Sequence, residues 1–356
     1  MNLSALFTPA SISARWTEAA SNRIPYLGEA LFPDEKKMGL DLSWIKGANG
    51  LPISLMPSAF DAMVTFRDRI GVEKIDTEMP FFREAYKIKE KDRQEILKAQ
   101  DTNSPYVKPI LAQIYKDIDN LVEGAKVASE RERMQLLFAA NGNVGIAIVA
   151  NGVQYVYNYD PNGAWKATNY FELAGQSVWT DATHADPFND FDVAKQAILD
   201  KTGEKSAIAI MNTITFNKLM AMNVVKNRYL TKANVAIGYF TKSEILKVVE
   251  DTAELRIVLY DKQFRDENKA TKKFVPDGYV AIVPNAALGN TWYGTTPEEA
   301  DLMSAQKSNA EVSIIGKGIA VTQEVTTHPV NTNTIVSQIV LPSYERMDDV
   351  ALLKVY

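Results

Sequence analysis

The sequence predicts an α+β protein in which one long helix separates extended N-terminal segments from a compact unit of strands and helices. Three observations support this fold class. Residues 108–140 carry one apolar stripe at helical spacing. Asn151 and Gly152 stand between two alternating apolar runs, which is a strong hairpin signal. Residues 188–300 then alternate short apolar runs with amphipathic segments, as mixed α/β units do.

The composition is that of a globular protein without disulfides. The 356 residues are 46% hydrophobic and 23% charged, with a net charge of -5 and no cysteine. This length predicts about two domains. The acidic balance argues against a broad face that binds nucleic-acid backbone. The absence of cysteine excludes disulfides and thiolate chemistry. We find no apolar run long enough to span a membrane and no secretory signal.

Residues that could carry catalysis are few and have structural explanations. His184 and His328 each lack a partner histidine at metal-ligand spacing. The acidic pair at 298–299 follows Thr296, which predicts a helix start with Thr296 as the N-cap. No phosphate-binding glycine loop and no nucleophile elbow is present in the sequence. We therefore predict no enzyme activity, no catalytic residue, no cofactor and no metal.

The first 90 residues are predicted to be extended rather than part of a compact core. Residues 1–45 mix short apolar stretches with prolines, and several large apolar side chains there need a surface to cover them. Residues 46–90 alternate on either side of a charged stretch around Gly71, which predicts a two-stranded ribbon with a charged tip. An isolated ribbon is marginal in water. It needs a neighbouring chain or element, although an ordinary hairpin of a local sheet is equally consistent with the pattern. The side chains to be covered are Trp16, Tyr26, Leu31, Phe32 and Trp44.

The long helix is the strongest signal in the chain. Apolar residues recur at steps of three or four from Ile110 to Ala128. Asn141 and Gly142 suit its C-terminal stop. A helix of ~33 residues is roughly 50 Å long. Its other face is charged, which predicts a long helix that packs against the protein on one side only. A coiled coil is disfavoured because Gly124 interrupts the apolar stripe.

Short apolar and amphipathic runs alternate in the second half. The predicted helices are 188–203, 213–222 and 241–251, the last capped by Thr241 or Ser243. The predicted strands are 206–212, 254–260 and 279–283, with a polar hairpin over 263–278, a turn at 285–290, and long β runs at 311–325 and 334–354.

Four local runs, in this order along the chain, resemble the lambda-type major capsid (head) proteins of tailed bacteriophages. They are AYKIKEKDRQEIL; SPYVKPILAQIYKDIDNLVEGAKVASERERMQLLFAANG; DPFNDFDVAKQAILDKTG with SAIAIMNTITFNKLM; and FVPDGYVAIVPNAALGNTWYGTTPEEAD. The resemblance implies the Hong-Kong-97-type phage capsid fold, with an N-terminal arm, an extended loop, a long spine helix, and peripheral and axial lobes. The expected segments are an arm at 1–45, an extended β-ribbon loop at 46–90, a peripheral domain at 91–187 with the spine at about 108–140, an axial domain at 188–307, and peripheral return strands at 308–356.

The resemblance implies a major capsid protein that self-assembles through pentamers and hexamers into the icosahedral head around double-stranded DNA. Such a protein resides in the virion capsid and assembles in the host cytoplasm. Its partners are other copies of itself, a separate scaffolding protein and a portal; a decoration protein stays an open alternative. DNA would be enclosed without sequence-specific binding. The candidate inter-subunit contacts are Arg67, Asp68, Arg69, Glu73, Lys74, Phe81, Phe82, Trp16, Tyr26 and Phe32.

Two other classes of function are kept as alternatives. The first is an encapsulin-like compartment, which would have the same fold and hold cargo protein in place of DNA. The second is an α/β enzyme that uses aspartate and glutamate with a divalent metal. A cargo peptide on the inner wall would favour the first, whereas metal-dependent activity in a monomer or small oligomer would favour the second.

Overall fold

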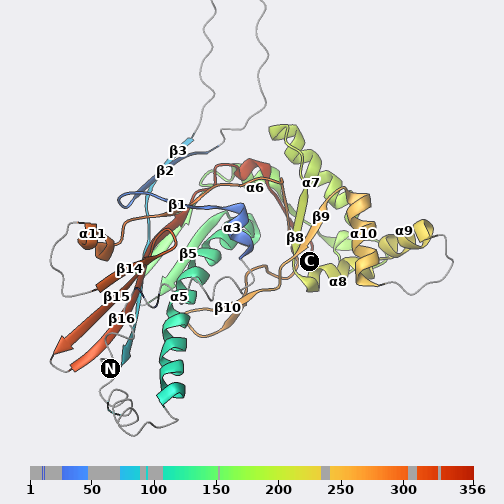
Figure 1. Ribbon diagram of the computed structural model, residues 1–356. Coiled ribbons are helices and arrows are strands. Elements are labelled where there is room, and N and C mark those ends of the chain that lie inside the picture. Colours follow the sequence, from blue (N-terminus) through green and yellow to red (C-terminus); the bar gives the residue numbers. More distant parts are fainter. Residues whose placement is uncertain are drawn as a thin grey trace, which may run out of the picture. The chain divides into compact units, whose positions relative to one another are not determined.

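The chain forms two compact units, each described here by itself (Figure 1). The computed structural model describes residues 10, 12, 26–46, 73–88, 94, 107–150, 153–233, 241–303, 311–327 and 330–356. Unit 1 contains Met1–Leu42, Asp76–Glu132 and Asn290–Ser343, and unit 2 contains Ser43–Ile75, Arg133–Gly289 and Tyr344–Tyr356.

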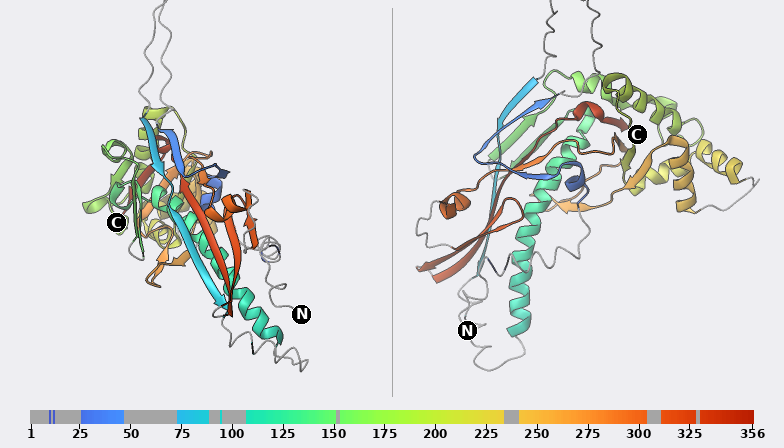
Figure 2. Two further views of the ribbon diagram at one scale, coloured as in Figure 1. Left: turned by 90° about the vertical axis from the view of Figure 1, so that its left-hand side faces the viewer. Right: turned by 45° about the horizontal axis from the view of Figure 1, so that its top comes forward.

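Unit 1 is organised around a sheet in the order β1-β13-β16-β15-β14, with β4 also paired to β16. The long strand β16 pairs antiparallel with β15 along one edge, and its other edge pairs first with β4 and then with β13. Figure 2 shows β4 and β16 running side by side. The strands are β1 (Asp34–Lys36), β4 (Phe81–Ile88), β13 (Thr291–Tyr293), β14 (Glu311–Ile315), β15 (Ile319–Thr327) and β16 (Val330–Pro342).

The predicted long helix is confirmed as α5 (Val107–Leu137). Ile118 and Val122 of its apolar stripe are buried, and the side-chain amide of Gln338 in β16 donates to the carbonyl of Ala125. The helix ends at Leu137, before the predicted residue 140. A 3-10 turn, η1 (Ala140–Gly142), follows, in which both Asn141 and Gly142 have positive φ. These two residues end the helical region as the sequence predicts.

Unit 2 is built on a five-stranded sheet in the order β7-β17-β12-β8-β9. Helices α7, α8 and α10 gather about β8 and β9 in Figure 1, and the core between them is made of aromatic and aliphatic side chains such as Phe191, Phe216 and Ile245. The strands are β7 (Tyr170–Glu172), β8 (Ile208–Met211), β9 (Arg256–Leu259), β12 (Tyr279–Val283) and β17 (Ala351–Lys354); the helices are α7 (Pro187–Thr202), α8 (Thr213–Ala221), α9 (Asn223–Ala233) and α10 (Lys242–Ala253).

Local capping signals determine where these helices begin. Asp186 accepts hydrogen bonds from the first-turn amides of α7, and Asn212 does the same for α8. Thr241 and Glu244 form a reciprocal capping box at α10, so Thr241 is the cap among the two predicted candidates. Gly203 ends α7 with φ of 74°.

A two-stranded hairpin follows the long helix, as predicted. Strands β5 (Gly145–Ala150) and β6 (Val153–Asn158) pair antiparallel, with Ala150 opposite Val153. This register leaves Asn151 and Gly152 as the two-residue connection. The polar excursion predicted at 263–278 also forms a hairpin, from β10 (Gln263–Arg265) and β11 (Thr271–Lys273).

The predicted ribbon is corrected in its boundaries. Its paired strands are β2 (Asp41–Lys46) and β3 (Glu73–Glu78). The run 81–88, which alternation placed in the ribbon, is strand β4 and pairs with β16 instead. Alternation predicts a strand but contains no information about its partner. Most of the predicted charged tip lies outside the described residues, which resume at Glu73.

The run predicted at 334–354 divides between two sheets. Strand β16 ends at Pro342 in unit 1, and β17 pairs with β12 and β7 in unit 2. The large apolar side chains of the first 45 residues were predicted to need a covering surface, and their own chain provides it for four of them. The structure buries them within the same chain, to exposures of 9% for Tyr26, 6% for Leu31, 0% for Phe32 and 7% for Trp44.

Candidate functional site

The histidines and carboxylates that sequence reasoning set aside do not converge on a catalytic centre in the described part of the chain. Nδ1 of His184 lies 2.8 Å from Oδ2 of Asp181, on an exposed surface of unit 2. This hydrogen bond lowers the pKa of Asp181 below its ordinary value. His328 lies outside the described residues. Within those residues, no three potential metal ligands come together. None of the described helices has the length and hydropathy that a membrane span needs.

The most distinctive polar group of unit 1 is a pair of adjacent buried carboxylates at the start of α11 (Pro297–Met303). Glu299 donates its backbone amide to Oγ1 of Thr296, which confirms Thr296 as the N-cap. The carboxylate of Glu299 lies 2.5 Å from Nζ of Lys36, and that of Glu298 pairs with Arg83. Sequence reasoning found the helix start but not these cations, because they lie far away along the chain.

Backbone contacts join the same region into a tight junction. The amide of Met79 donates to the carbonyl of Leu40 at 2.9 Å, which connects the chain just before β2 with the chain just after β3. Gly294 lies against this point. A Cβ atom on Gly294 would come within 2.9 Å of both the carbonyl oxygen of Gly39 and Cε of Met79. We call this region the ribbon base: residues 36–42, residues 76–83, and the start of α11 with Gly294.

A second set of polar contacts attaches the short helix α3 (Leu27–Leu31) to the long helix α5. The hydroxyl of Tyr26 bonds to the carboxylate of Glu123, and the amide of Gly28 donates to Oε1 of Glu130 at 3.0 Å. A carboxylate that accepts from the N-terminus of a helix is also favoured by the helix dipole. These contacts explain why Tyr26 is buried within its own chain.

The predicted inter-subunit contacts have different outcomes. Tyr26 and Phe32 are buried in unit 1 and therefore not exposed for a neighbour. Phe81 and Phe82 are half-buried in β4, where the guanidinium of Arg83 lies over the Phe81 ring. Trp16, Arg67, Asp68 and Arg69 lie outside the described residues, and Glu73 and Lys74 are described only as backbone of β3.

Several large apolar side chains remain exposed in the described part of unit 1. Met38, in the ribbon base, is 69% exposed, and Leu302 and Met303 of α11 are 54% and 55% exposed. Val325 of β15 is 52% exposed. Exposed apolar side chains on a monomer are individually ordinary, but a subunit that assembles into a shell uses such surfaces.

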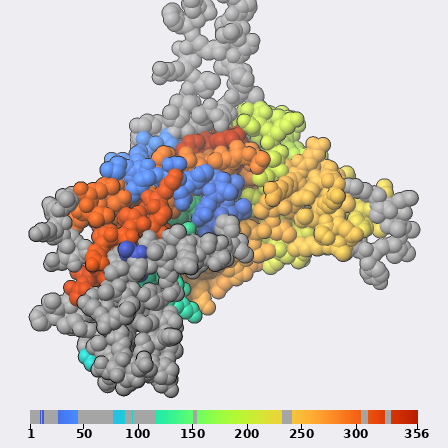
Figure 3. Space-filling view, in the orientation of Figure 1, coloured from blue at the N-terminus to red at the C-terminus, as the bar shows by residue number. Residues whose placement is uncertain are grey.

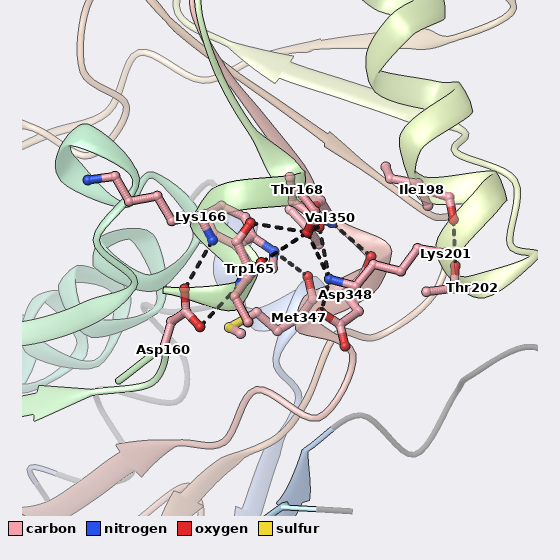
Figure 4. Close-up of polar contacts among 12 residues, drawn as sticks. Asp160, Trp165, Lys166, Thr168, Ile198, Lys201, Thr202, Met347, Asp348 and Val350 are labelled. Carbon is pink, nitrogen blue, oxygen red and sulfur yellow. Dashed lines mark hydrogen bonds and ion pairs between the residues drawn. The ribbon is translucent and has the colours of Figure 1, made fainter. Parts of the chain in front are cut away.

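In unit 2, a buried polar cluster attaches helix α6 (Ala164–Asn169) to the C-terminal tail (Figure 4). The indole Nε1 of Trp165 donates to the carbonyl of Met347 at 2.8 Å. The amide of Asn169 donates to the carbonyls of Asp348 and Val350. Lys201 of α7 completes the cluster through an ion pair with Asp348 at 2.8 Å. This arrangement is structural, because every polar group in it points at another part of the same unit.

Asp190 is a buried carboxyl of unit 2 whose pKa is raised above its ordinary value. It lies in the first turn of α7 and accepts a 2.8 Å hydrogen bond from Nε1 of Trp179. The pKa of Asp190 is raised to about 6, mainly by burial; the hydrogen bond from Trp179 opposes this shift and the charge of Asp186 adds to it. The Trp179 ring packs edge-on against Phe191. A carboxyl with a raised pKa in a packed core makes the stability of the fold depend on pH, because burial disfavours its ionised form.

A hollow of about 450 Å³ lies between the end of α5 and the β5–β6 hairpin. Lys166 is its cationic group, and its Nζ already donates to Oδ1 of Asn143. The carboxylate of Asp160 accepts the amides of Trp165 and Lys166, so it caps α6. The polar groups of the hollow are therefore occupied by local structure.

Comparison with known proteins gives the family. A family model described as phage major capsid protein E matches residues 8–355. The fold matches a protein described as a prophage capsid protein of Escherichia coli CFT073, with 13% identity, a TM-score of 0.59, and coverage of 98% of this chain and 99% of that one. It also matches a phage-related protein from Bordetella bronchiseptica RB50, with 14% identity, a TM-score of 0.55, and 96% of each chain covered. A comparison with curated protein sequences found no match.

The structural matches show a fold shared with phage capsid proteins, which confirms the fold class expected from the sequence. The family match covers nearly the whole chain, including the long helix, both sheets and the ribbon strands. The chain therefore belongs to the phage major capsid protein E family.

Proposed function

We propose that this protein is the subunit of a phage head and that copies of it assemble through pentamers and hexamers into an icosahedral shell around double-stranded DNA. The observation that carries this proposal is the family match over residues 8–355. It is supported by a chain that forms a paired ribbon and a large sheet and that leaves apolar side chains of unit 1 exposed.

The ribbon is the element proposed to contact a neighbouring copy. Its described strands, β2 and β3, pair only with each other among the described strands, and we propose that an outer edge pairs with a neighbouring copy. We propose that charged residues toward its tip form ion pairs across copies. Exposed ion pairs contribute little affinity, but they determine register. The proposed residues are Arg67, Asp68, Arg69, Glu73 and Lys74.

The division into lobes is also a proposal. Unit 1, with its large sheet and most of α5, has the composition expected of the peripheral lobe. In unit 2, strands β8, β9 and β12 and helices α8 to α10 fall within 188–307, the segment predicted as the axial domain. Strand β17 then belongs with the second group, so the peripheral return is proposed to end before residue 344.

The proposed partners follow from shell assembly. Copies of the same chain are the main partner. We further propose assembly in the host cytoplasm with a separate scaffolding protein and a portal. The net charge of -5 is consistent with a shell that encloses DNA without binding its phosphate backbone tightly.

Electron microscopy of the purified protein, expressed alone and with a candidate scaffolding protein, tests the proposal. We expect rings or closed shells after size fractionation. The contents of the shells separate two alternatives: nuclease-protected DNA indicates a phage head, whereas protein cargo indicates an encapsulin-like compartment. A monomer or dimer under every condition would contradict the proposal and return a metal-dependent enzyme to consideration.

A further inference from the structure

The start of α11 lies next to both chain segments that connect to the ribbon. Before the ribbon, β1 ends at Lys36 and β2 begins at Asp41. After the ribbon, β3 ends at Glu78 and β4 begins at Phe81. On the surface of unit 1 in Figure 3, the blue N-terminal segment lies against the orange segment that includes β13 and α11.

Each of the two adjacent carboxylates of α11 holds one of these segments. Oε2 of Glu299 accepts a 2.5 Å hydrogen bond from Nζ of Lys36, which also donates to the carbonyl of Gly294 at 3.0 Å. Glu298 pairs through Oε1 with Arg83 of β4 and accepts through Oε2 from the hydroxyl of Ser337 at 2.9 Å. Lys36 precedes the ribbon and Arg83 follows it, so one turn of helix binds the chain on both sides.

The two carboxylates are buried, whereas the side chains of Lys36 and Arg83 are 28% and 48% exposed. Glu298 and Glu299 are 8% and 6% exposed. A buried carboxylate is tolerated when cations and hydrogen-bond donors compensate its lost hydration, and removing one partner leaves an uncompensated charge. Movement of either ribbon segment away from α11 would therefore separate a buried charge from its partner.

The packing of Gly294 is a second and independent observation at the same point. A Cβ there would lie 2.6 Å from Cγ2 of Ile339, and 2.9 Å from atoms of both Gly39 and Met79. Gly39 belongs to the segment before the ribbon, and Met79 to the segment after it. The absence of a side chain at Gly294 thus lets both segments approach β13 together.

We propose that Glu298 and Glu299 are positioning residues for the ribbon: they hold the segments before and after it together against β13 and β16, and so determine where the ribbon leaves unit 1. This inference rests on the proposed function, in which the ribbon contacts a neighbouring copy. A ribbon whose two ends are held is pre-organised for that contact, which lowers the entropy lost on assembly.

Amide hydrogen exchange on the unassembled subunit tests the positioning directly. Glu298→Gln and Glu299→Gln keep side-chain size and remove the charge. We expect exchange to accelerate about tenfold or more at residues 36–42 and 76–83, because local opening no longer separates an ion pair. Asp301→Asn is the matched control, an exposed carboxylate on the same helix, and should leave these residues unchanged. Peptides from α10 report whether unit 2 stays intact.

A double-mutant cycle separates pairing from a general loss of α11. Lys36→Met alone and Glu299→Gln alone should each accelerate exchange, and the double variant should exceed neither single variant by much, since both remove the same contact. Multiplicative effects would contradict a direct pair. Unchanged exchange at both ribbon segments in Glu298→Gln and Glu299→Gln would overturn the inference.

Shell formation by the same variants completes the test. We expect wild-type protein and Asp301→Asn to form shells, and both glutamine variants to form several-fold fewer or irregular ones. Faster exchange with normal shells would overturn the positioning role in assembly. A wild-type protein that forms no rings or shells would contradict the proposed function alone, because the exchange comparison does not depend on assembly.

Discussion

The substitution Asp190→Asn is expected to stabilise the protein, and only at neutral or higher pH. The carboxyl of Asp190 is 8% exposed and its pKa is raised to about 6 from an ordinary value of 3.8. The folded state therefore binds this proton more tightly than the unfolded state. The stability that this carboxyl contributes is present below about pH 4 and is lost as pH rises through about 6.

The difference of about two pKa units corresponds to about 3 kcal/mol at pH 8. Because some solvent reaches the site and asparagine must place an amide group there, we expect a smaller gain of about 1–2 kcal/mol in unfolding free energy. The acceptor for Nε1 of Trp179 is retained, since asparagine keeps one carbonyl oxygen. At about pH 4 the gain should be close to zero, because the wild-type carboxyl is then protonated.

Urea unfolding of the unassembled subunit, followed by tryptophan fluorescence between about pH 4 and pH 8, measures this difference. The control is Asp192→Asn, on the same helix, whose side chain is 69% exposed and pairs with Lys195. The control should change stability little at any pH. A destabilised Asp190→Asn protein at pH 8, or a difference that does not vary with pH, would refute the assignment of burial as the dominant effect.

Three further outcomes are expected. Gly278 has φ of 78°, and a Cβ there would lie 2.8 Å from the carbonyl oxygen of Tyr356. Gly278→Ala should therefore lower the unfolding free energy by about 1–3 kcal/mol, measured as a lower urea midpoint. An unchanged midpoint would show that the C-terminal residues move to accommodate the Cβ. Trp165→Phe removes one of the two donors to the carbonyl of Met347, which keeps the amide of Val350. It should cost about 1–2 kcal/mol, with faster hydrogen exchange at the C-terminal strand as the specific readout. Neutral substitution of residues 67–69 by serine should leave the unfolding curve unchanged but reduce the yield of shells in electron micrographs; normal shells would remove the ribbon tip from the proposed contacts.

Some features of the fold follow from neighbouring residues and were therefore readable in the sequence. Helix α5 was predicted from its apolar stripe, the hairpin from Asn151 and Gly152, and the start of α10 from Thr241. In each case the information is local: side chains three or four residues apart share a helix face, and caps bind amides within the next turn. The family resemblance was likewise carried by the order of local runs.

The contacts of the ribbon base were less predictable from the sequence. Thr296 predicted the start of α11. Nothing in a single sequence, however, indicates that Glu299 pairs with Lys36 or that Glu298 pairs with Arg83. Gly294 reads as an ordinary turn glycine, whereas its role is to permit close approach of two distant segments.

The sequence by itself determined the long helix, the hairpin around Asn151 and Gly152, the helix starts near Thr241 and Thr296, and the resemblance to phage capsid proteins. Only the tertiary structure decided that β4 pairs with β16 and not with a ribbon strand, and that β17 pairs with β12 in a different sheet from β16. It also decided that Phe32 is buried by its own chain. Strand pairing and burial depend on contacts between residues far apart in the chain, and alternation is the same whichever partner a strand takes.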